Sequence, residues 1–275
     1  MIDDLDAILN EKGAETLLLF SESYKNANMY YLTKFLAPDP FIFLKRVDTD
    51  PIILVNQMEY SRALKESIVK DVRSYFEYNY IEIMHRATDQ NIGTTQFIIE
   101  VIKKELGSST LCVPHTFPVM TADILRKKFP NLKPMFGVVE KARETKDVDE
   151  LKELQAVQAV TQEVMAETID LIANTTVGNH GTLLSRRSLL TVGALKSFLR
   201  HKLIDPGCVL EADAIVACGP KGSDPHYAGD PSDKLKANQP IILDVFPRSA
   251  QKRYWSDMTR TIVKGKASEK VKGMF

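Results

Sequence analysis

The first half of the chain alternates short apolar runs with segments of helical periodicity. The runs are brief and rich in aliphatic or aromatic residues, as buried strands are, and they occupy residues 16–20, 41–44, 52–55 and 110–113. Apolar residues recur at helical spacing over residues 58–70, 94–106 and 120–128. This alternation of strands and helices predicts an α/β domain over residues 1–138.

The second half begins with a long predicted helix. Asp147 and Glu150 are spaced as in a capping box, and apolar positions keep a helical period to residue 173. A second helix is predicted over residues 189–203. The pattern then changes to strands at residues 214–218, 241–246 and 254–263, with a loop rich in glycine and proline at residues 219–231. The segment at residues 140–146 is charged and has no apolar pattern, so we place the boundary between the two domains there.

Composition narrows the classes of function. The 36 Lys and Arg balance the 36 Asp and Glu, which argues against a nucleic-acid partner. The three cysteines form no CxxC pair, and acidic residues near the start replace the basic ones of a signal peptide, so we expect a cytoplasmic protein with reduced thiols. No uncharged stretch is apolar enough to span a bilayer. The sequence also contains no GxGxxG, GxxxxGK[ST], GxSxG or HExxH motif.

Two aspartates in the predicted C-terminal hairpin are the main candidates for chemistry. Asp244 lies inside an apolar strand, where an ionised carboxylate needs a partner or a cation. If the strands pair about a turn at residues 249–252, Asp244 faces Asp257 directly, with Cβ atoms about 5 Å apart. Such carboxylates repel one another unless one is protonated or a divalent ion with oxygen ligands lies between them. In that register, the hairpin predicts a metal site.

The same residues also allow a structural interpretation. Each aspartate would then pair with one of three nearby arginines, Arg248, Arg253 and Arg260, or cap a turn. His226, in the loop that precedes the hairpin, is the second candidate: its imidazole could exchange protons with a substrate near neutral pH, or could simply be solvated. The other four histidines show no ligand spacing.

On these residues, the sequence resembles the creatinase/prolidase/aminopeptidase P superfamily, the "pita-bread" metallopeptidases. IILDVFPR followed by YWSDMTRTIV is similar to the family's strand with an aspartate and to its S-D-x-T-R-T block. GPKGSDPHYAG resembles the family's stretch with a histidine that contacts substrate. ARETKDVDELKELQAV is similar to the family's charged hinge and first long catalytic helix, and NMYYLTKF and VNQMEYSRALKES are similar to parts of its N-terminal domain.

The resemblance implies a creatinase-type N-terminal α/β domain over residues 1–138 and the N-terminal half of an α+β pita-bread domain over residues 139–275. Asp244 and Asp257 would hold a pair of divalent ions, manganese, cobalt or zinc, and His226 would assist proton transfer. The implied reaction is hydrolysis of the bond on the N-terminal side of proline, in a dipeptide or a peptide, through a metal-activated water. A homodimer is also implied.

The chain departs from the family pattern in two ways. The gap between the aspartates is longer than in well-known members, which implies a larger turn. The family's remaining ligands are one His and two Glu, but after Asp257 the sequence offers only Glu269. We therefore expect this chain by itself to hold metal weakly or not at all and to be inactive. Two alternatives are a non-catalytic interaction or dimerisation protein derived from the family, and a metal-free creatinase-like hydrolase, which the presence of both aspartates disfavours.

Overall fold

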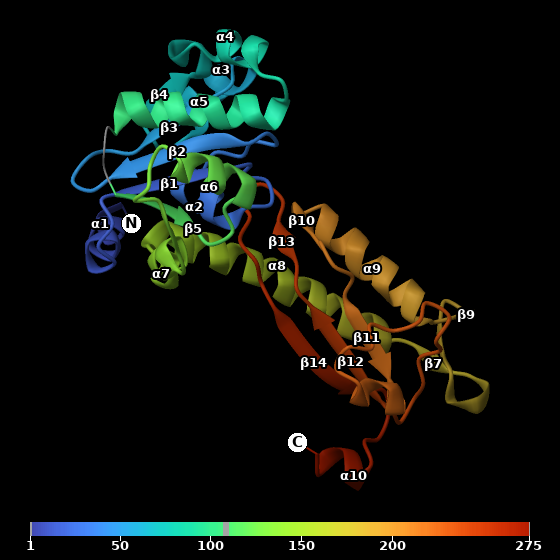
Figure 1. Cartoon of the computed structure of the whole chain (residues 1–275). Helices are drawn as coiled ribbons and strands as arrows, with labels where there is room; N and C mark the ends of the chain where they lie inside the picture. Colours follow the sequence, from blue (N-terminus) through green and yellow to red (C-terminus); the bar gives the residue numbers. More distant parts are fainter. Residues whose placement is uncertain (1, 107–109, 275) are drawn as a thin grey trace. The chain divides into compact units, whose positions relative to one another are not determined.

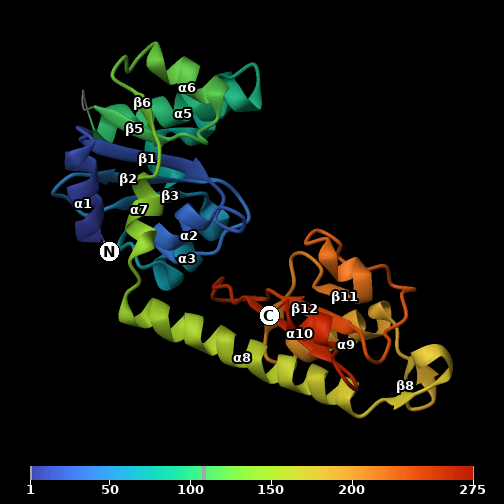
Figure 2. The same ribbon diagram turned by 90° about the horizontal axis from the view of Figure 1, so that it is seen from below.

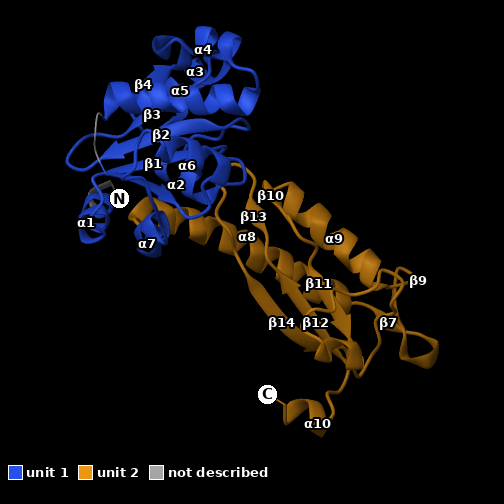
Figure 3. Cartoon of the chain, viewed as in Figure 1, with its two compact units in different colours: residues 1–146 blue, residues 147–275 orange. Residues whose placement is uncertain are grey.

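The chain divides into two compact units, residues 1–146 and residues 147–275 (Figure 1, Figure 3). The computed structural model describes residues 2–106 and 110–274. Each unit builds its own core of buried apolar side chains. Among the described residues, no helix is both long and apolar enough to cross a membrane.

The first unit is a three-layer α/β structure. Its elements, in chain order, are α1 (Ile2–Glu11), β1 (Thr16–Ser21), α2 (Ala27–Thr33), β2 (Phe41–Arg46), β3 (Ile52–Val55), α3 (Gln57–Glu66), β4 (Asp71–Ser74), the 3₁₀ helix η1 (Tyr75–Tyr78), α4 (Tyr80–Arg86), α5 (Gln90–Glu105), β5 (Leu111–Pro114), α6 (Val119–Arg126), β6 (Lys133–Met135) and α7 (Val138–Glu144).

The six strands of this unit form one sheet in the order β4-β3-β2-β1-β5-β6, in which β2 is antiparallel to both of its neighbours. Because side chains alternate along a strand, Leu17 and Leu19 of β1 pack into one core and Leu18 packs into the other. The first core contains α1, α2, α3 and α7, and the second contains α5 and α6 (Figure 2). Strands that are apolar at nearly every position must be buried on both sides, and here helices cover both faces of the sheet.

The second unit is an α+β structure with a smaller sheet. Its elements, in chain order, are α8 (Val148–Ala173), β7 (Thr176–Val177), the 3₁₀ helix η2 (Asn179–Gly181), β8 (Leu183–Ser185), β9 (Ser188–Leu189), α9 (Val192–Ile204), β10 (Cys208–Val209), β11 (Ile215–Cys218), the 3₁₀ helix η3 (Gly219–Ser223), β12 (Pro240–Val245), β13 (Arg248–Ser249), β14 (Met258–Val263) and α10 (Glu269–Lys272).

Strands β11, β12 and β14 form an antiparallel sheet with β12 in the centre. Along β12, Ile241, Leu243 and Val245 are almost completely buried, and they share a core with apolar residues of α8 and α9. The alternate positions of β12 are only half-buried. One face of the sheet is therefore covered by helices, and the other face carries Asp244.

Most of the predicted elements are present, with shifted ends. The predicted capping box is confirmed: the Asp147 side chain accepts the Glu150 N–H at 2.8 Å, and the Glu150 carboxylate accepts the Asp147 N–H at 3.3 Å. The predicted strand at residues 254–263 is shorter and begins at Met258. The charged segment at residues 140–146, for which no element was predicted, lies mainly in helix α7.

Candidate functional site

The hairpin that carries the two aspartates has a different register from the one assumed. Asp244 on β12 lies opposite Thr259 on β14, so the expected direct pairing of Asp244 with Asp257 is wrong by two residues. The turn explains the shift. The Ser249 N–H donates to the Tyr254 carbonyl at 2.9 Å, and a loop of residues 250–253 is closed by Arg253 in a left-handed conformation with φ of 64°. Arginine is rarely found in a left-handed turn position, so no residue type indicated that the turn lies one residue later than predicted.

The two-residue shift leaves Asp244 and Asp257 on the same face of the sheet, because the side-chain period of a strand is two. Asp257 directly precedes β14 and is exposed, whereas its neighbours Ser256 and Met258 point into the protein. Asp257 is therefore a diagonal neighbour of Asp244, at a typical spacing of about 7–8 Å between backbones. This spacing allows both carboxylates to reach one bound ion or adjacent ions.

Asp244 lies on the open face of its strand rather than in a dry core, and it is half-buried. Its neighbours Leu243 and Val245 take the buried positions, so only one face of the strand packs into the core. The Thr259 hydroxyl donates a hydrogen bond to Asp244 Oδ1. This hydrogen bond orients the carboxylate while leaving its second oxygen available.

The arginines of the hairpin do not neutralise these aspartates. Arg248 and Arg253 both pair with Glu211, and Arg260 donates to the Thr259 carbonyl at 2.8 Å. Across residues 2–106 and 110–274, no lysine or arginine forms an ion pair with either aspartate. The structural interpretation of the aspartates as arginine partners is therefore wrong.

A pocket of about 250 Å³ opens beside Asp244 on this face. Thr259 and Ile242 line it from the sheet, and Ser223, Asp224 and Pro225 line it from the loop that joins β11 to β12. Its lining therefore combines two carboxylates, two hydroxyls and an apolar wall. Oxygen donors of this kind suit hard divalent cations.

Two glycines allow the β11–β12 loop to lie in close contact with the sheet. A Cβ added to Gly222 would lie 2.8 Å from Ile242 Cδ1, and one added to Gly229 would lie 2.1 Å from the Val216 carbonyl oxygen. Gly229 also has φ of 100°, where side chains other than hydrogen are strained. The Gly222 contact therefore places the pocket-lining part of the loop against β12, which carries Asp244, and the Gly229 contact places a later part of the loop against β11.

His226 belongs to the same loop but does not line the pocket in the structure. Its backbone N–H donates to Asp224 Oδ1 at 2.9 Å, which forms a local turn, and its side chain is exposed. His226 directly follows Pro225, a lining residue. The structure thus brings Asp244, Asp257 and Thr259 to one face, and the exposed imidazole is not part of the pocket lining.

A polar network fixes the other half of the loop. Lys221 Nζ donates to Asp233 Oδ1 and, at 3.2 Å, to the Tyr227 hydroxyl, which in turn donates to Asp233 Oδ2. The hydrogen bond from Lys221 is the main cause that holds the pKa of Asp233 below its usual range, and Tyr227 contributes in the same direction. The same contacts raise the pKa of Lys221. Asp233 and Lys221 therefore form a charged pair at neutral pH.

We expect this network to weaken under acid conditions. The Asp233 carboxyl has a lower pKa when folded than when unfolded, so its stabilisation is present above the unfolded pKa of about 3.9 and is lost as the pH falls through the folded value. Asp233→Asn should lower the melting temperature at pH 7, and the difference from the wild type should shrink below about pH 4. Melting curves from pH 3 to pH 7 test this, and a pH-independent difference would contradict it.

The donor chemistry fits a divalent ion, but the number of donors is small. Among the described residues, no group of three or more His, Cys, Asp or Glu side chains is placed to hold a metal. Asp244 and Asp257 would supply the charge, and the Thr259 hydroxyl orients one of them. Sequence reasoning missed Thr259, although the SDMTRT block that includes it was the signal from which it could have been found.

Two known families match the chain. Residues 1–145 match the creatinase/prolidase N-terminal domain, and residues 152–275 match metallopeptidase family M24. No curated protein matches it.

Solved structures with the same fold include three peptidases. The chain is similar to an Xaa-Pro dipeptidase from Bacillus anthracis (TM-score 0.75, 20% identity, covering 99% of this chain and 66% of that one). It is also similar to a prolidase from Pyrococcus horikoshii (TM-score 0.68, 18% identity, 99% and 67% coverage) and to an X-Pro aminopeptidase from Thermotoga maritima (TM-score 0.71, 16% identity, 97% and 67% coverage). The chain thus spans about two thirds of the length of these structures.

Proposed function

Because the chain belongs to the creatinase/prolidase/aminopeptidase P family of metallopeptidases, we propose that it serves the hydrolysis of the peptide bond that precedes proline, in a dipeptide or at the N-terminus of a peptide. The observation that carries this proposal is the pair of aspartates, Asp244 and Asp257, on one open face with no arginine or lysine partner among the described residues. The substrate class is supported by the names of the similar structures, an Xaa-Pro dipeptidase and a prolidase.

In this proposal, Asp244 and Asp257 hold the divalent metal, and Thr259 keeps Asp244 in position through its hydroxyl. A divalent ion supplies Lewis acidity toward a carbonyl group when it is bound. Ile242 and Pro225 give the pocket an apolar wall suited to a pyrrolidine ring. His226 would move a proton to or from the substrate, which requires its exposed side chain to turn toward the pocket.

Two carboxylates are fewer ligands than a catalytic pair of ions needs. We therefore propose that ligands beyond these two complete the centre, and that this chain by itself binds manganese, cobalt or zinc weakly and does not turn over substrate. A homodimer in the cytoplasm fits the same proposal. The alternative, a non-catalytic interaction protein, would bind no metal at Asp244 and Asp257.

Titration calorimetry with the dipeptide Ala-Pro tests the proposed substrate class. We expect Ala-Pro to bind in the presence of manganese, to bind much more weakly when EDTA is added, and to lose binding in Asp257→Ala. Ala-Gly, which lacks proline, is the matched control ligand and should bind less tightly. Failure of Ala-Pro to bind in a metal-dependent way would contradict the proposed function, and turnover of Ala-Pro by the chain alone would contradict only the argument from ligand number.

A further inference from the structure

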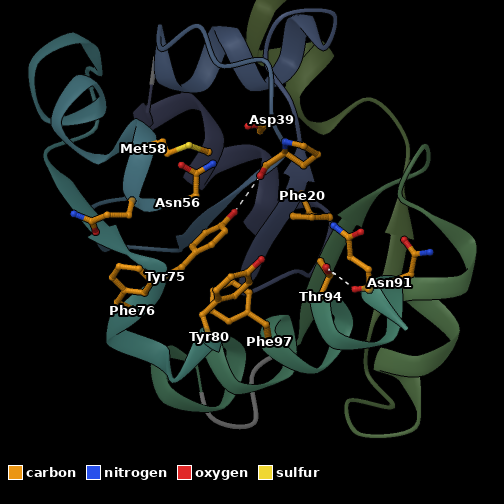
Figure 4. Close-up of a pocket in the computed structure, with 13 residues that line it drawn as sticks. Phe20, Asp39, Asn56, Met58, Tyr75, Phe76, Tyr80, Asn91, Thr94 and Phe97 are labelled. Atoms are coloured by element: carbon orange, nitrogen blue, oxygen red, sulfur yellow. Dashed lines mark hydrogen bonds between the residues drawn. The ribbon is translucent and has the colours of Figure 1, made fainter. Parts of the chain in front are cut away.

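A second pocket, of about 690 Å³, lies in the first unit (Figure 4). It lies where three strands end: Phe20 is near the end of β1, Asn56 follows β3, and Tyr75 follows β4. These three strands run in the same direction, because β2 alone is antiparallel between them. In open α/β sheets, ligands bind outside the carboxyl ends of the strands, so this is the expected edge for a binding site. Its volume is within the range of known ligand sites.

The bottom of the pocket is a cluster of aromatic rings. Tyr75, Tyr80 and Phe97 pack with ring centroids 4.6–5.1 Å apart, and the Tyr75 hydroxyl donates to the Pro40 carbonyl at 3.0 Å. Tyr75 and Phe97 are buried. Phe76, by contrast, exposes 54% of its surface at the side of the pocket. The cluster therefore offers a fixed apolar floor and one ring that is free to stack on a ligand.

Side-chain amides surround this floor. Four of them, Asn56, Gln57, Gln90 and Asn91, line the pocket. The Asn56 and Gln57 carbonyls are engaged, with the Glu59 N–H and the Ser74 hydroxyl, each at 3.0 Å. The side chains of Gln90 and Asn91 form no hydrogen bond with any described residue. Each of these free amides can both donate and accept, as a peptide backbone requires.

Charge limits the ligand further. No lysine, arginine or histidine is among the described residues that line the pocket, and Asp39 is its one charged side chain. Phosphorylated or carboxylate-rich ligands therefore find no counter-charge there. Met58, with 79% of its surface exposed, adds a flexible thioether of the kind that adapts to varied peptide side chains.

We propose that this pocket binds a proline-containing peptide segment in an extended, polyproline-like conformation. One pyrrolidine ring would stack on Phe76 and another would lie against the aromatic floor, the peptide backbone would pair with Gln90 and Asn91, and a basic group would pair with Asp39. Aromatic grooves bind such segments because the conformation is preformed and leaves its carbonyls free. The choice of a proline-containing peptide over other ring-bearing ligands rests on the proposed function.

Binding of a fluorescein-labelled Ala-Pro-Pro-Ala-Pro-Pro-Lys peptide to the whole chain, measured by anisotropy in EDTA, tests this inference. Phe76→Ala should weaken binding by about tenfold, because a stacking ring is lost. Phe136→Ala is the matched control: Phe136 is in the same unit, is 74% exposed and lies outside the pocket, so affinity should not change. The methyl resonance of Met58, identified as the one absent from Met58→Leu, should shift as the peptide is added.

The same assay separates this pocket from the aspartate site. We expect Asp257→Ala to bind the labelled peptide as the wild type does. If Asp257→Ala loses peptide binding and Phe76→Ala keeps it, the peptide binds at the aspartates. That result would support the proposed function and overturn this inference. The inference would also be overturned if the wild type did not bind the peptide. The same holds if adenosine or maltotriose, and not the peptide, shifted the methyl resonance of Met58. Peptide binding that depends on Phe76 supports the inference even if metal-dependent Ala-Pro binding fails.

Discussion

Replacing Gly229 with alanine is expected to detach the β11–β12 loop from the sheet and to lower the free energy of unfolding of the second unit by about 2–4 kcal/mol. The new Cβ would lie 2.1 Å from the Val216 carbonyl oxygen, a backbone atom that cannot move without disturbing β11. The φ of 100° adds strain of its own. The Val216 N–H also donates to the Ala228 carbonyl at 3.1 Å, so the substitution disturbs a hydrogen bond that ties the loop to the strand.

Urea unfolding followed by the fluorescence of Trp255 measures this effect. Trp255 is the only tryptophan in the sequence and belongs to the second unit, so its signal reports on that unit. Gly207→Ala is the matched control, because Gly207 has φ of 76° with nothing within 4 Å of an added Cβ. Gly207→Ala should lower the free energy of unfolding by only about 1 kcal/mol, the strain of a positive φ. Equal losses in the two variants would show that the contact with Val216 is unimportant.

The elements that sequence reasoning found are those whose signal is local. The capping box of α8 needs only Asp147 and Glu150, three residues apart, and both of its hydrogen bonds form. The apolar runs of β1, β2 and β3 were evident because helices cover both faces of their sheet. The α/β type of the first half followed from these patterns, whereas the α+β type of the second half was implied by the family resemblance.

The missed helix α7 shows the opposite case. Only Val138, Val139 and Ala142 of this helix are buried, and its remaining residues are charged. Seven residues with three apolar positions are too few for a periodic pattern to appear in the sequence. What fixes the helix is packing: its buried residues join the core formed by α1 and α2. Tertiary contacts of this kind leave little local signal.

The face on which the two aspartates lie was predicted from the sequence, whereas their register was not. Asp244 and Asp257 were placed on one face, and the structure places them there, yet their pairing was off by two residues because the turn that Arg253 closes is centred one residue later than expected. An error of two residues preserves the face of a strand, whereas an error of one would have separated the aspartates. The side chain of His226 is exposed and outside the pocket lining, which no local sequence pattern indicated.

Removing either aspartate is expected to abolish stabilisation of the chain by divalent metal. An ion that binds only the folded state stabilises it by about 2.7 kcal/mol at a concentration one hundred times its Kd. With saturating manganese, the wild type should therefore melt at a higher temperature than in EDTA, and Asp244→Asn and Asp257→Asn should not. Asp170→Asn is the matched control, since Asp170 is an exposed acid on α8 of the same unit, and its response to manganese should equal that of the wild type.

The behaviour in EDTA distinguishes a metal site from a structural role. Asp244 and Asp257 are like charges on one face with no cationic partner among the described residues, so neutralising Asp257 relieves repulsion in the metal-free protein. Asp257→Asn should therefore be as stable as the wild type in EDTA, or more stable, and less stable in manganese. Asp244→Asn keeps an acceptor for the Thr259 hydroxyl and should behave in the same way. If both variants were destabilised equally in EDTA and in manganese, the aspartates would be structural, and the family's metal chemistry would not operate through them.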